Sequence, residues 1–193
     1  MKLKNLAFLL SLLLFGCSVS QKSEPIRTGT YFDLVELLDE QIATFEVERP
    51  ILTKELSVNG EPDKIIVQLD SAEQWKEELG LFYQADINKL GLETSYATEE
   101  LSTGNGNRKV IDSAKTEKPT VRTIEYNYIE NQLKSIRIII RDENPVYKFE
   151  KELNLYFNAV QGKSILSSFA ISGDQSMILK DELNYSLKAT IGK

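Results

Sequence analysis

The sequence predicts an α+β domain in which two N-terminal helices pack on one face of a twisted, mainly antiparallel β-sheet, with a half-barrel as the more curved form of the same plan. Apolar and polar side chains alternate through residues 121–157, which is typical of a meander of antiparallel strands with one buried face. Upstream, apolar residues recur at helical spacing in residues 31–44 and 71–84. Neither kind of element can bury its apolar side alone, so we expect the helices to cover the sheet.

The first 16 residues are expected to be a signal peptide. Lys2 and Lys4 precede an apolar run, Leu6–Phe15, which is shorter than the about 20 residues that a transmembrane helix needs. The run ends in Leu14-Phe15-Gly16-Cys17. This stretch resembles the lipobox of bacterial lipoproteins, and the resemblance implies cleavage before Cys17 and diacylation of its thiol. The alternative is an ordinary secretory peptide with an incidental cysteine.

Residues 17–27 are expected to be the acylated cysteine and a flexible tether, because they are polar and carry no hydrophobic period. Residues 28–193 would then form a single α+β domain. In Gram-negative lipoproteins, a serine such as Ser18 after the acylated cysteine implies sorting to the outer membrane. Surface-exported lipoproteins of the Bacteroidota often carry an acidic run at this place, and its absence here favours the leaflet that faces the periplasm.

The charge of the chain limits its partners. The formal charge is −6, and loss of the signal peptide removes two lysines and no acid, which gives −8. An acidic domain without a basic cluster is a poor candidate for nucleic-acid binding, so we expect contact with the membrane only through the lipid anchor. Cys17 is the only cysteine, so no disulfide stabilises the domain.

The N-terminal half predicts two helices and a hairpin between them. Thr30 is expected to cap the helix over 31–44, and Asn59-Gly60 to close a hairpin over 51–69. Ser71 with Gln74 has the pattern of a capping box at the start of the helix over 71–84. A shorter helical piece over 86–90 is expected to follow and to end at Gly91.

The passage from Trp75 to Leu90 contains a Trp, a Glu-Leu pair and an Asp-Ile-Asn-Lys run. In these residues it resembles uncharacterised lipoproteins of the Bacteroidota. The resemblance covers a small part of the chain and implies no known activity.

The C-terminal half predicts strands on both sides of the meander. Residues 96–101 and 109–114 are expected to pair through a glycine-rich turn. Further strands are expected at 165–171, 177–179 and 185–191, with a turn at Gly173-Asp174, which gives roughly six to nine strands in all.

The register of the first hairpin of the meander depends on whether its loop, near residues 130–132, has an odd or an even number of residues. Opposed residues of an antiparallel pair share a face, so the loop must have an odd length, most simply Glu130–Gln132. Tyr126 would then oppose Ile136, and Glu125 would oppose Arg137.

The second meander hairpin needs an even loop, most simply residues 142–145, which include an Asn-Pro pair. Ile138 would then oppose Phe149, and Arg137 would oppose Glu150. Arg137 is therefore expected between two glutamates on the polar face.

The available side chains exclude the commonest catalytic and metal-binding designs. There is no histidine, and no cysteine beyond Cys17. The glycine-rich stretch 102–107 lacks the following helix and the lysine of a phosphate loop, so a hairpin turn is the simpler interpretation. Asp142-Glu143-Asn144 lacks the further oxygen ligands of a calcium loop. A Ser–Lys dyad or a carboxylate pair remains open in principle, but we expect no enzyme, no metal and no cofactor.

Six residues on the apolar face are candidates for lining a ligand cavity: Tyr126, Tyr128, Ile138, Tyr147, Phe149 and Lys151. A buried hydroxyl or ammonium is costly without a partner. The polar ends of these side chains are therefore expected either to reach the rim of the sheet or to line the polar part of a cavity. A curved antiparallel sheet with a helix across its mouth is similar, in element order and compartment alone, to the periplasmic lipoprotein carriers.

The leading functional expectation is a lipid-anchored envelope protein with a non-enzymatic binding or scaffolding role, with other envelope proteins or a lipid as partners. The alternative is a periplasmic carrier of a lipid or another apolar ligand. A filled apolar face favours the scaffold, and a cavity of about 300 Å³ or more that is ringed by Tyr126, Tyr147 and Lys151 favours the carrier. A hydrolase would need two carboxylates about 5–10 Å apart in a cleft.

Overall fold

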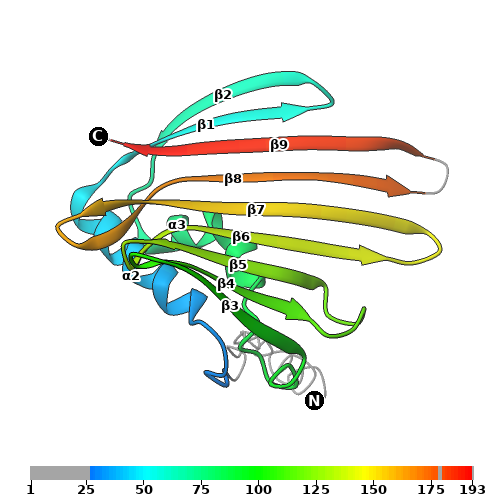
Figure 1. Cartoon of the computed structure of the whole chain (residues 1–193). Coiled ribbons are helices and arrows are strands. Elements are labelled where there is room, and N and C mark those ends of the chain that lie inside the picture. Colours follow the sequence, from blue (N-terminus) through cyan, green and yellow to red (C-terminus); the bar gives the residue numbers. More distant parts are fainter. Residues whose placement is uncertain (1–26, 178–179, 193) are drawn as a thin grey trace, which may run out of the picture.

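The computed structural model describes residues 27–177 and 180–192, which form three helices and one open antiparallel sheet (Figure 1). The prediction of a mainly antiparallel sheet accompanied by helices is confirmed. The predicted signal peptide, Cys17 and residues 18–26 of the tether lie outside the described residues. No helix in the described part of the chain is long and apolar enough to cross a membrane.

The helices are α2 (Leu34–Glu48), α3 (Ala72–Glu78) and α4 (Gly80–Gln84). The strands are β1 (Ile51–Val58), β2 (Glu61–Gln68), β3 (Tyr96–Gly104), β4 (Asn107–Ala114), β5 (Val121–Ile129), β6 (Gln132–Glu143), β7 (Tyr147–Val160), β8 (Lys163–Met177) and β9 (Lys180–Gly192). Their order across the sheet is β2-β1-β9-β8-β7-β6-β5-β4-β3, so β2 and β3 are the two edges.

Helix α2 starts later than predicted, because Asp33 and not Thr30 is its N-cap. A carboxylate oxygen of Asp33 accepts the N–H of Glu36 at 2.7 Å. The Thr30 hydroxyl instead donates to the Thr28 hydroxyl at 3.4 Å. The residues between Thr30 and Asp33 are held in a non-helical segment by contacts with Asn88, which are described below.

The predicted helix over 71–84 is divided into α3 and α4 at Leu79. Ser71 is the N-cap as expected and accepts the N–H of Gln74 at 3.3 Å. The predicted helical piece over 86–90 is wrong. Its Lys89 forms an isolated antiparallel bridge with Arg27, so this segment pairs with the start of the described chain instead of coiling.

Two hairpins close with the turns that the sequence indicates. Asn59-Gly60 joins β1 to β2 with φ of 49° and 88°, and Asn105-Gly106 joins β3 to β4 with φ of 53° and 73°. Left-handed backbone at both central residues is what a two-residue hairpin turn requires. The glycine-rich stretch 102–107 is therefore part of a hairpin.

The predicted turn at Gly173-Asp174 is wrong, because both residues lie inside β8. A Cβ at Gly173 would lie 2.9 Å from the Tyr185 hydroxyl and 2.7 Å from the carbonyl oxygen of Glu150. The glycine thus allows a side chain of β9 to lie across β8. The strand predicted at 177–179 falls on Met177, which ends β8, and on two residues outside the described part.

The first meander hairpin has the predicted pairing but not the predicted loop. Tyr126 opposes Ile136, as expected. The turn is Glu130-Asn131, with φ of 52° and 61°, and the register shifts at Lys134, which is left over between two opposed pairs. A two-residue turn plus one bulged residue adds up to an odd number. Each side chain therefore points to the same face of the sheet as the predicted odd loop would have given.

The register of the second meander hairpin differs from the prediction. Ile138 opposes Leu153 instead of Phe149, because β6 continues to Glu143. The turn is fixed by Asn144, whose side-chain oxygen accepts the N–H groups of the two residues that follow Pro145 at 2.8 and 3.1 Å. The slip amounts to four residues and is even, so every side chain keeps its predicted face.

The polar face carries a chain of ion pairs that crosses four strands. Arg137 lies 3.5 Å from Glu125, as predicted, and 2.6 Å from Glu152, whereas Glu150 was expected. Lys109 extends this row of ion pairs, because its ammonium lies 3.1 Å from a carboxylate oxygen of Glu125. Exposed pairs of this kind stabilise by about 0.2–1 kcal/mol each, so their main effect is to favour one register.

The opposite face carries the core beneath the helices. Figure 1 shows the helices over one face of the sheet, toward the strand ends that carry the β7–β8 turn. The ring of Phe82 from α4 lies 5.8 Å from that of Phe169, and Phe45 of α2 lies 4.5 Å from Trp75 of α3. Ile138 is fully buried in this core.

The core position of Ile138 is testable by truncation. We expect Ile138→Ala to lower the free energy of unfolding by about 2–5 kcal/mol, because it leaves a cavity in a packed region. The neighbouring Ile139 points to the polar face and is half-buried, so Ile139→Ala is the matched control and should cost clearly less. Urea unfolding measures both, and a loss below about half a kcal/mol for Ile138→Ala would contradict its core assignment.

Candidate functional site

A groove of about 630 Å³ runs between α2 and the nearby end of the sheet. Its lining combines apolar and polar side chains, the main ones being Phe32, Leu37, Glu40, Thr44, Tyr128, Asn131, Leu133, Lys163 and Ile165. The volume falls in the range of about 300–1,000 Å³ that is typical of ligand sites. We call this feature the α2 groove.

The floor of the α2 groove is held by Gln41, which is only 3% exposed. Its side-chain oxygen accepts the N–H of Leu166 at 2.8 Å, and its nitrogen donates to the carbonyl of Ser164 at 3.4 Å. The pairing of β7 with β8 shifts register here, so Ser167 is a bulged residue with no opposed residue on β7. Gln41 therefore satisfies two backbone groups of β8 close to the bulge.

The sheet side of the α2 groove is formed by Tyr128. The Arg108 guanidinium lies 4.1 Å from the centre of its ring and 3.6 Å from a carboxylate oxygen of Glu100. Burial raises the pKa of the Tyr128 hydroxyl, and the charge of Arg108 opposes the shift. This wall is thus an aromatic face fixed by a cation.

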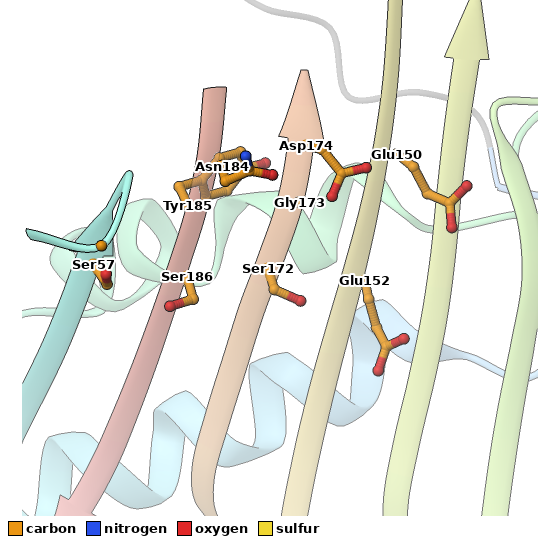
Figure 2. Close-up of a pocket in the computed structure, with 10 residues that line it drawn as sticks. Ser57, Glu150, Glu152, Ser172, Gly173, Asp174, Asn184, Tyr185 and Ser186 are labelled. Carbon is orange, nitrogen blue, oxygen red and sulfur yellow. The ribbon is translucent and has the colours of Figure 1, made fainter. Parts of the chain in front are cut away.

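Two adjoining grooves, of about 360 and 660 Å³, cross the polar face of the sheet over β1, β9 and β8. They share Ser57, Ser186 and Ser172, which oppose one another on neighbouring strands and point to the same side (Figure 2). We call the two together the serine trough. Its floor of small hydroxyl side chains leaves room for a ligand and offers both donors and acceptors.

Carboxylates line one end of the serine trough, namely those of Glu150, Glu152 and Asp174. Two of them are ion-paired: Glu150 with Arg141, and Glu152 with Arg137. The hydrogen bond from Arg137 lowers the pKa of Glu152, although burial opposes the shift.

The six cavity residues predicted from the sequence lie in three separate places. Tyr126 and Ile138 are buried in the packed core, at 1% and 0% exposure. Tyr128 lines the α2 groove. None of the grooves described above reaches Tyr126 or Ile138.

The other three predicted residues lie together near the β6–β7 turn. The rings of Tyr147 and Phe149 are stacked with centres 6.0 Å apart, and the Lys151 ammonium lies 4.9 Å from the centre of the Phe149 ring. The Tyr147 hydroxyl donates to Asp142 at 2.6 Å. Lys151 is half-buried and opposes Ile140, so it lies on the apolar face as expected.

Two carboxylates, Asp86 and Asp112, are buried although the sequence pattern did not predict it. Asp86 accepts from the guanidinium of Arg27 at 3.3 Å. Asp112 forms no ion pair with a cation of residues 27–177 or 180–192 and accepts from the Thr98 hydroxyl at 2.5 Å. Burial raises the pKa of Asp112, and the Thr98 hydroxyl and the nearby Tyr126 hydroxyl oppose the shift.

The Tyr126 hydroxyl faces Asp112 but has no partner at ordinary hydrogen-bond distance within the described ranges. Its burial, and then the charge of Asp112, raise the pKa of this hydroxyl well above its usual value. No group of three or more acids or cysteines in the described residues is arranged to hold a metal ion.

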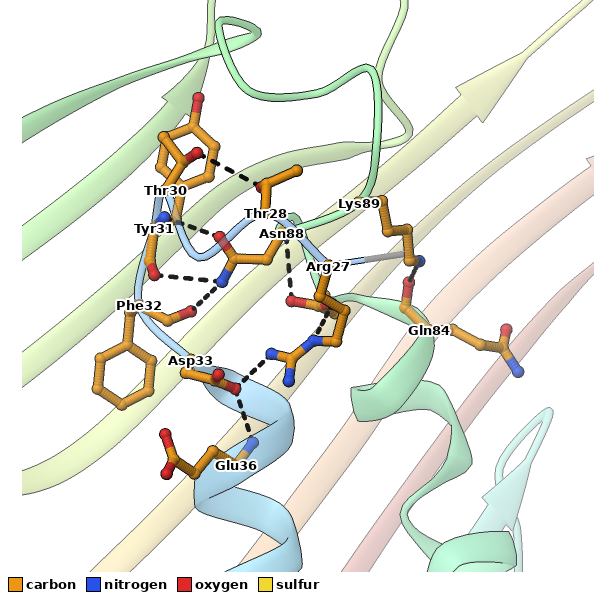
Figure 3. A network of polar contacts seen from close by, with 11 residues as sticks. Arg27, Thr28, Thr30, Tyr31, Phe32, Asp33, Glu36, Gln84, Asn88 and Lys89 are labelled. Atoms are coloured by element: carbon orange, nitrogen blue, oxygen red, sulfur yellow. Dashed lines mark hydrogen bonds and ion pairs between the residues drawn. The ribbon is translucent and has the colours of Figure 1, made fainter. Parts of the chain in front are cut away.

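Residues 27–33 form a strap that is fixed by the buried Asn88 (Figure 3). The Asn88 side chain accepts the N–H of Tyr31 at 2.8 Å and donates to the carbonyls of Tyr31 and Phe32 at 3.1 and 3.0 Å. Arg27 pairs with both Asp33 and Asp86. Arg27, which the sequence analysis placed in the tether, therefore already belongs to the fold.

Comparison with known proteins adds no relative. No protein-family model matches the chain, and no curated protein and no solved structure was found to match it.

The buried Asp112 predicts a specific pH dependence. Its pKa is higher in the folded protein than the unfolded value near 3.8, so it costs no stability below that pH and an increasing amount as the pH rises toward its folded pKa. We expect Asp112→Asn, which keeps an acceptor for Thr98, to gain stability relative to wild type as the pH rises. Urea unfolding from pH 3 to 7 measures this.

Asp33 is the matched control with the opposite sign. Burial alone would raise its pKa, but Arg27 and the N–H of Glu36 lower it overall. Its contribution is therefore present above its unfolded pKa and lost as the pH falls through the folded value, so Asp33→Asn should destabilise at pH 7 and much less in acid. A pH-independent effect of Asp112→Asn would contradict the assignment of Asp112 as a buried, unpaired acid.

Proposed function

We propose that the protein is a lipid-anchored envelope protein with a non-enzymatic binding or scaffolding role, held in the outer membrane and facing the periplasm. The observation that supports this role best is the filled apolar face. Tyr126 on β5 and Ile138 on β6, two of the six candidate residues, are enclosed by packed side chains. Recognition is then left to open grooves on the surface.

The serine trough is the surface that fits this role. It lies on strands of a continuous sheet, so its groups are held in place before a ligand binds. The smaller groove has a mostly polar lining, which suits an extended ligand rich in hydrogen-bonding groups, such as a segment of another envelope protein. The larger groove adds apolar contacts from Leu56, Ile171 and Leu187. Of its five carboxylates, Glu150 and Glu152 pair with arginines and Glu55 pairs with Lys64, so binding to the trough would depend on hydrogen bonds more than on net charge.

A carrier of a lipid or another apolar ligand is the second candidate, and the α2 groove favours it. The groove has apolar walls in Leu37, Leu133 and Ile165, the aromatic face of Tyr128, and a cation in Lys163 that could meet an acidic head group. A carrier would use this groove and not the enclosed middle of the apolar face.

Lipid attachment is tested by growing cells with a clickable fatty acid. We expect label on the wild-type chain and on Ser18→Ala, and none on Cys17→Ser, because only the cysteine thiol becomes acylated. Label on Cys17→Ser, or a wild-type product that is soluble in the periplasm, would contradict the anchor.

The two functions are separated by the full chain carrying Cys17→Ser, which has no acyl chains of its own. The scaffolding role predicts no co-purified lipid in native mass spectrometry and no change in melting temperature with oleic acid. A carrier would be stabilised by about 2.7 kcal/mol at a hundredfold excess of ligand over its Kd.

Groove-filling variants locate any lipid that is found. Ala43 is an exposed residue of α2 that lines the groove, so Ala43→Trp should block it without changing the core. Ala159→Trp, at an exposed position of β7 outside the groove, is the matched control. Lipid that binds in the control and is lost in Ala43→Trp would overturn the scaffolding role in favour of the carrier.

A further inference from the structure

One half of the edge strand β2 is protected from pairing with a further strand, and the other half is not. It forms the outermost strand of the sheet beside β1 (Figure 1). In the first half, Pro62 has no N–H, and the N–H of Lys64 donates to a carboxylate oxygen of Asp63 at 2.7 Å. Prolines and charges are the usual means by which natural sheets keep their edges from pairing.

The second half of β2 lacks such protection. Ile65 is 44% exposed and Ile66 is 66% exposed. Backbone groups of a strand point alternately to its two sides, and the Lys64 N–H points away from β1, since it bonds to Asp63. By the same alternation, Ile66 and Gln68 present their N–H and C=O groups to the free edge.

We propose that β2 pairs with β2 of a second copy of this chain, antiparallel and about a two-fold axis through Ile66. In this register Ile66 opposes its own symmetry mate on the polar face, and Ile65 opposes Val67 on the apolar face. Lys64 opposes Gln68. All five opposed residues, 64–68, belong to β2.

The charges of β2 disfavour the other symmetric registers. An axis at Lys64 or at Asp63 would oppose like charges. An axis at Ile65 would place Lys64 opposite Ile66. An axis at Val67 would reach Asp70, which lies beyond the end of β2 and whose N–H already donates to Gln74 at 2.7 Å.

The pairing is expected to be weak. In the proposed register, the N–H of Ile66 donates to its mate and the N–H of Gln68 donates to the carbonyl of Lys64 of the second copy, while Lys64 can keep its bond to Asp63. A five-residue edge buries far less than the about 1,200 Å² of a stable interface, and two copies of a chain with a charge of −6 repel each other. The dimer should therefore form only at high local concentration.

Disulfide cross-linking of the full-length chain tests both the pairing and its register. Opposed hydrogen-bonded residues have Cα atoms about 5.5 Å apart, which a disulfide can bridge. We expect Ile66→Cys to form a cross-linked dimer by itself on oxidation. Lys64→Cys and Gln68→Cys should each stay monomeric alone and should cross-link when mixed.

Two controls separate pairing from chance contact. The wild type reports any reaction of Cys17, and Gln161→Cys, at the exposed β7–β8 turn, reports random collision. Sedimentation provides a readout without new cysteines: the average mass of the wild type should rise with concentration, and Ile66→Lys should abolish the rise.

Several outcomes would overturn the proposal. One is equal cross-linking at Ile66 and Gln161, and another is a monomer at all concentrations. Cross-linking of Ile66→Cys with Gln68→Cys would move the axis to Val67 and refute the proposed register. Attachment of Ile66→Cys to a different protein in cells would show that the edge serves another partner.

Discussion

The fold depends on one constraint: a nine-stranded antiparallel sheet with one apolar face must be covered by helices much shorter than its width. The contacts of Phe82 with Phe169 and of Gln41 with the bulge in β8 place this cover over the strand ends near the β7–β8 turn. The α2 groove lies at the margin of the covered region. The serine trough lies on the side that needs no cover, and β2 remains an open edge.

The faces of the meander could be predicted from sequence because alternation has a fixed period of two, which any even slip preserves. The loops could not. Lys134 is bulged and Asn144 organises a turn later than expected, and neither event leaves a mark in the hydrophobic pattern. Gly173 was taken for a turn because glycine has two uses: it permits unusual backbone angles, and it allows close approach, which is its role beneath Tyr185.

The candidate sites were less predictable, since they arise where distant segments meet. Tyr128 was found because it alternates with the core, but its groove exists only once α2 is placed against the sheet. Gln41 could have been found, because it is a polar residue within the buried stripe of a helix. Asn88 had no local signal, since its partner Tyr31 is 57 positions away in the chain.

The strap would have a mechanical consequence if the proposed lipid anchor holds the chain at its N-terminus. A pull on the chain before Arg27 would act first on its ion pairs with Asp86 and with Asp33, the N-cap of α2, and then on the bonds to Asn88. Asn88 is buried and forms three hydrogen bonds with the backbone of Tyr31 and Phe32. These three bonds would share the pulling force, so they would break at nearly the same time and not one after another. With the proposed anchor at Cys17, the stretch from Cys17 to Arg27 would span about 35 Å at most, which would limit the distance between the domain and the membrane.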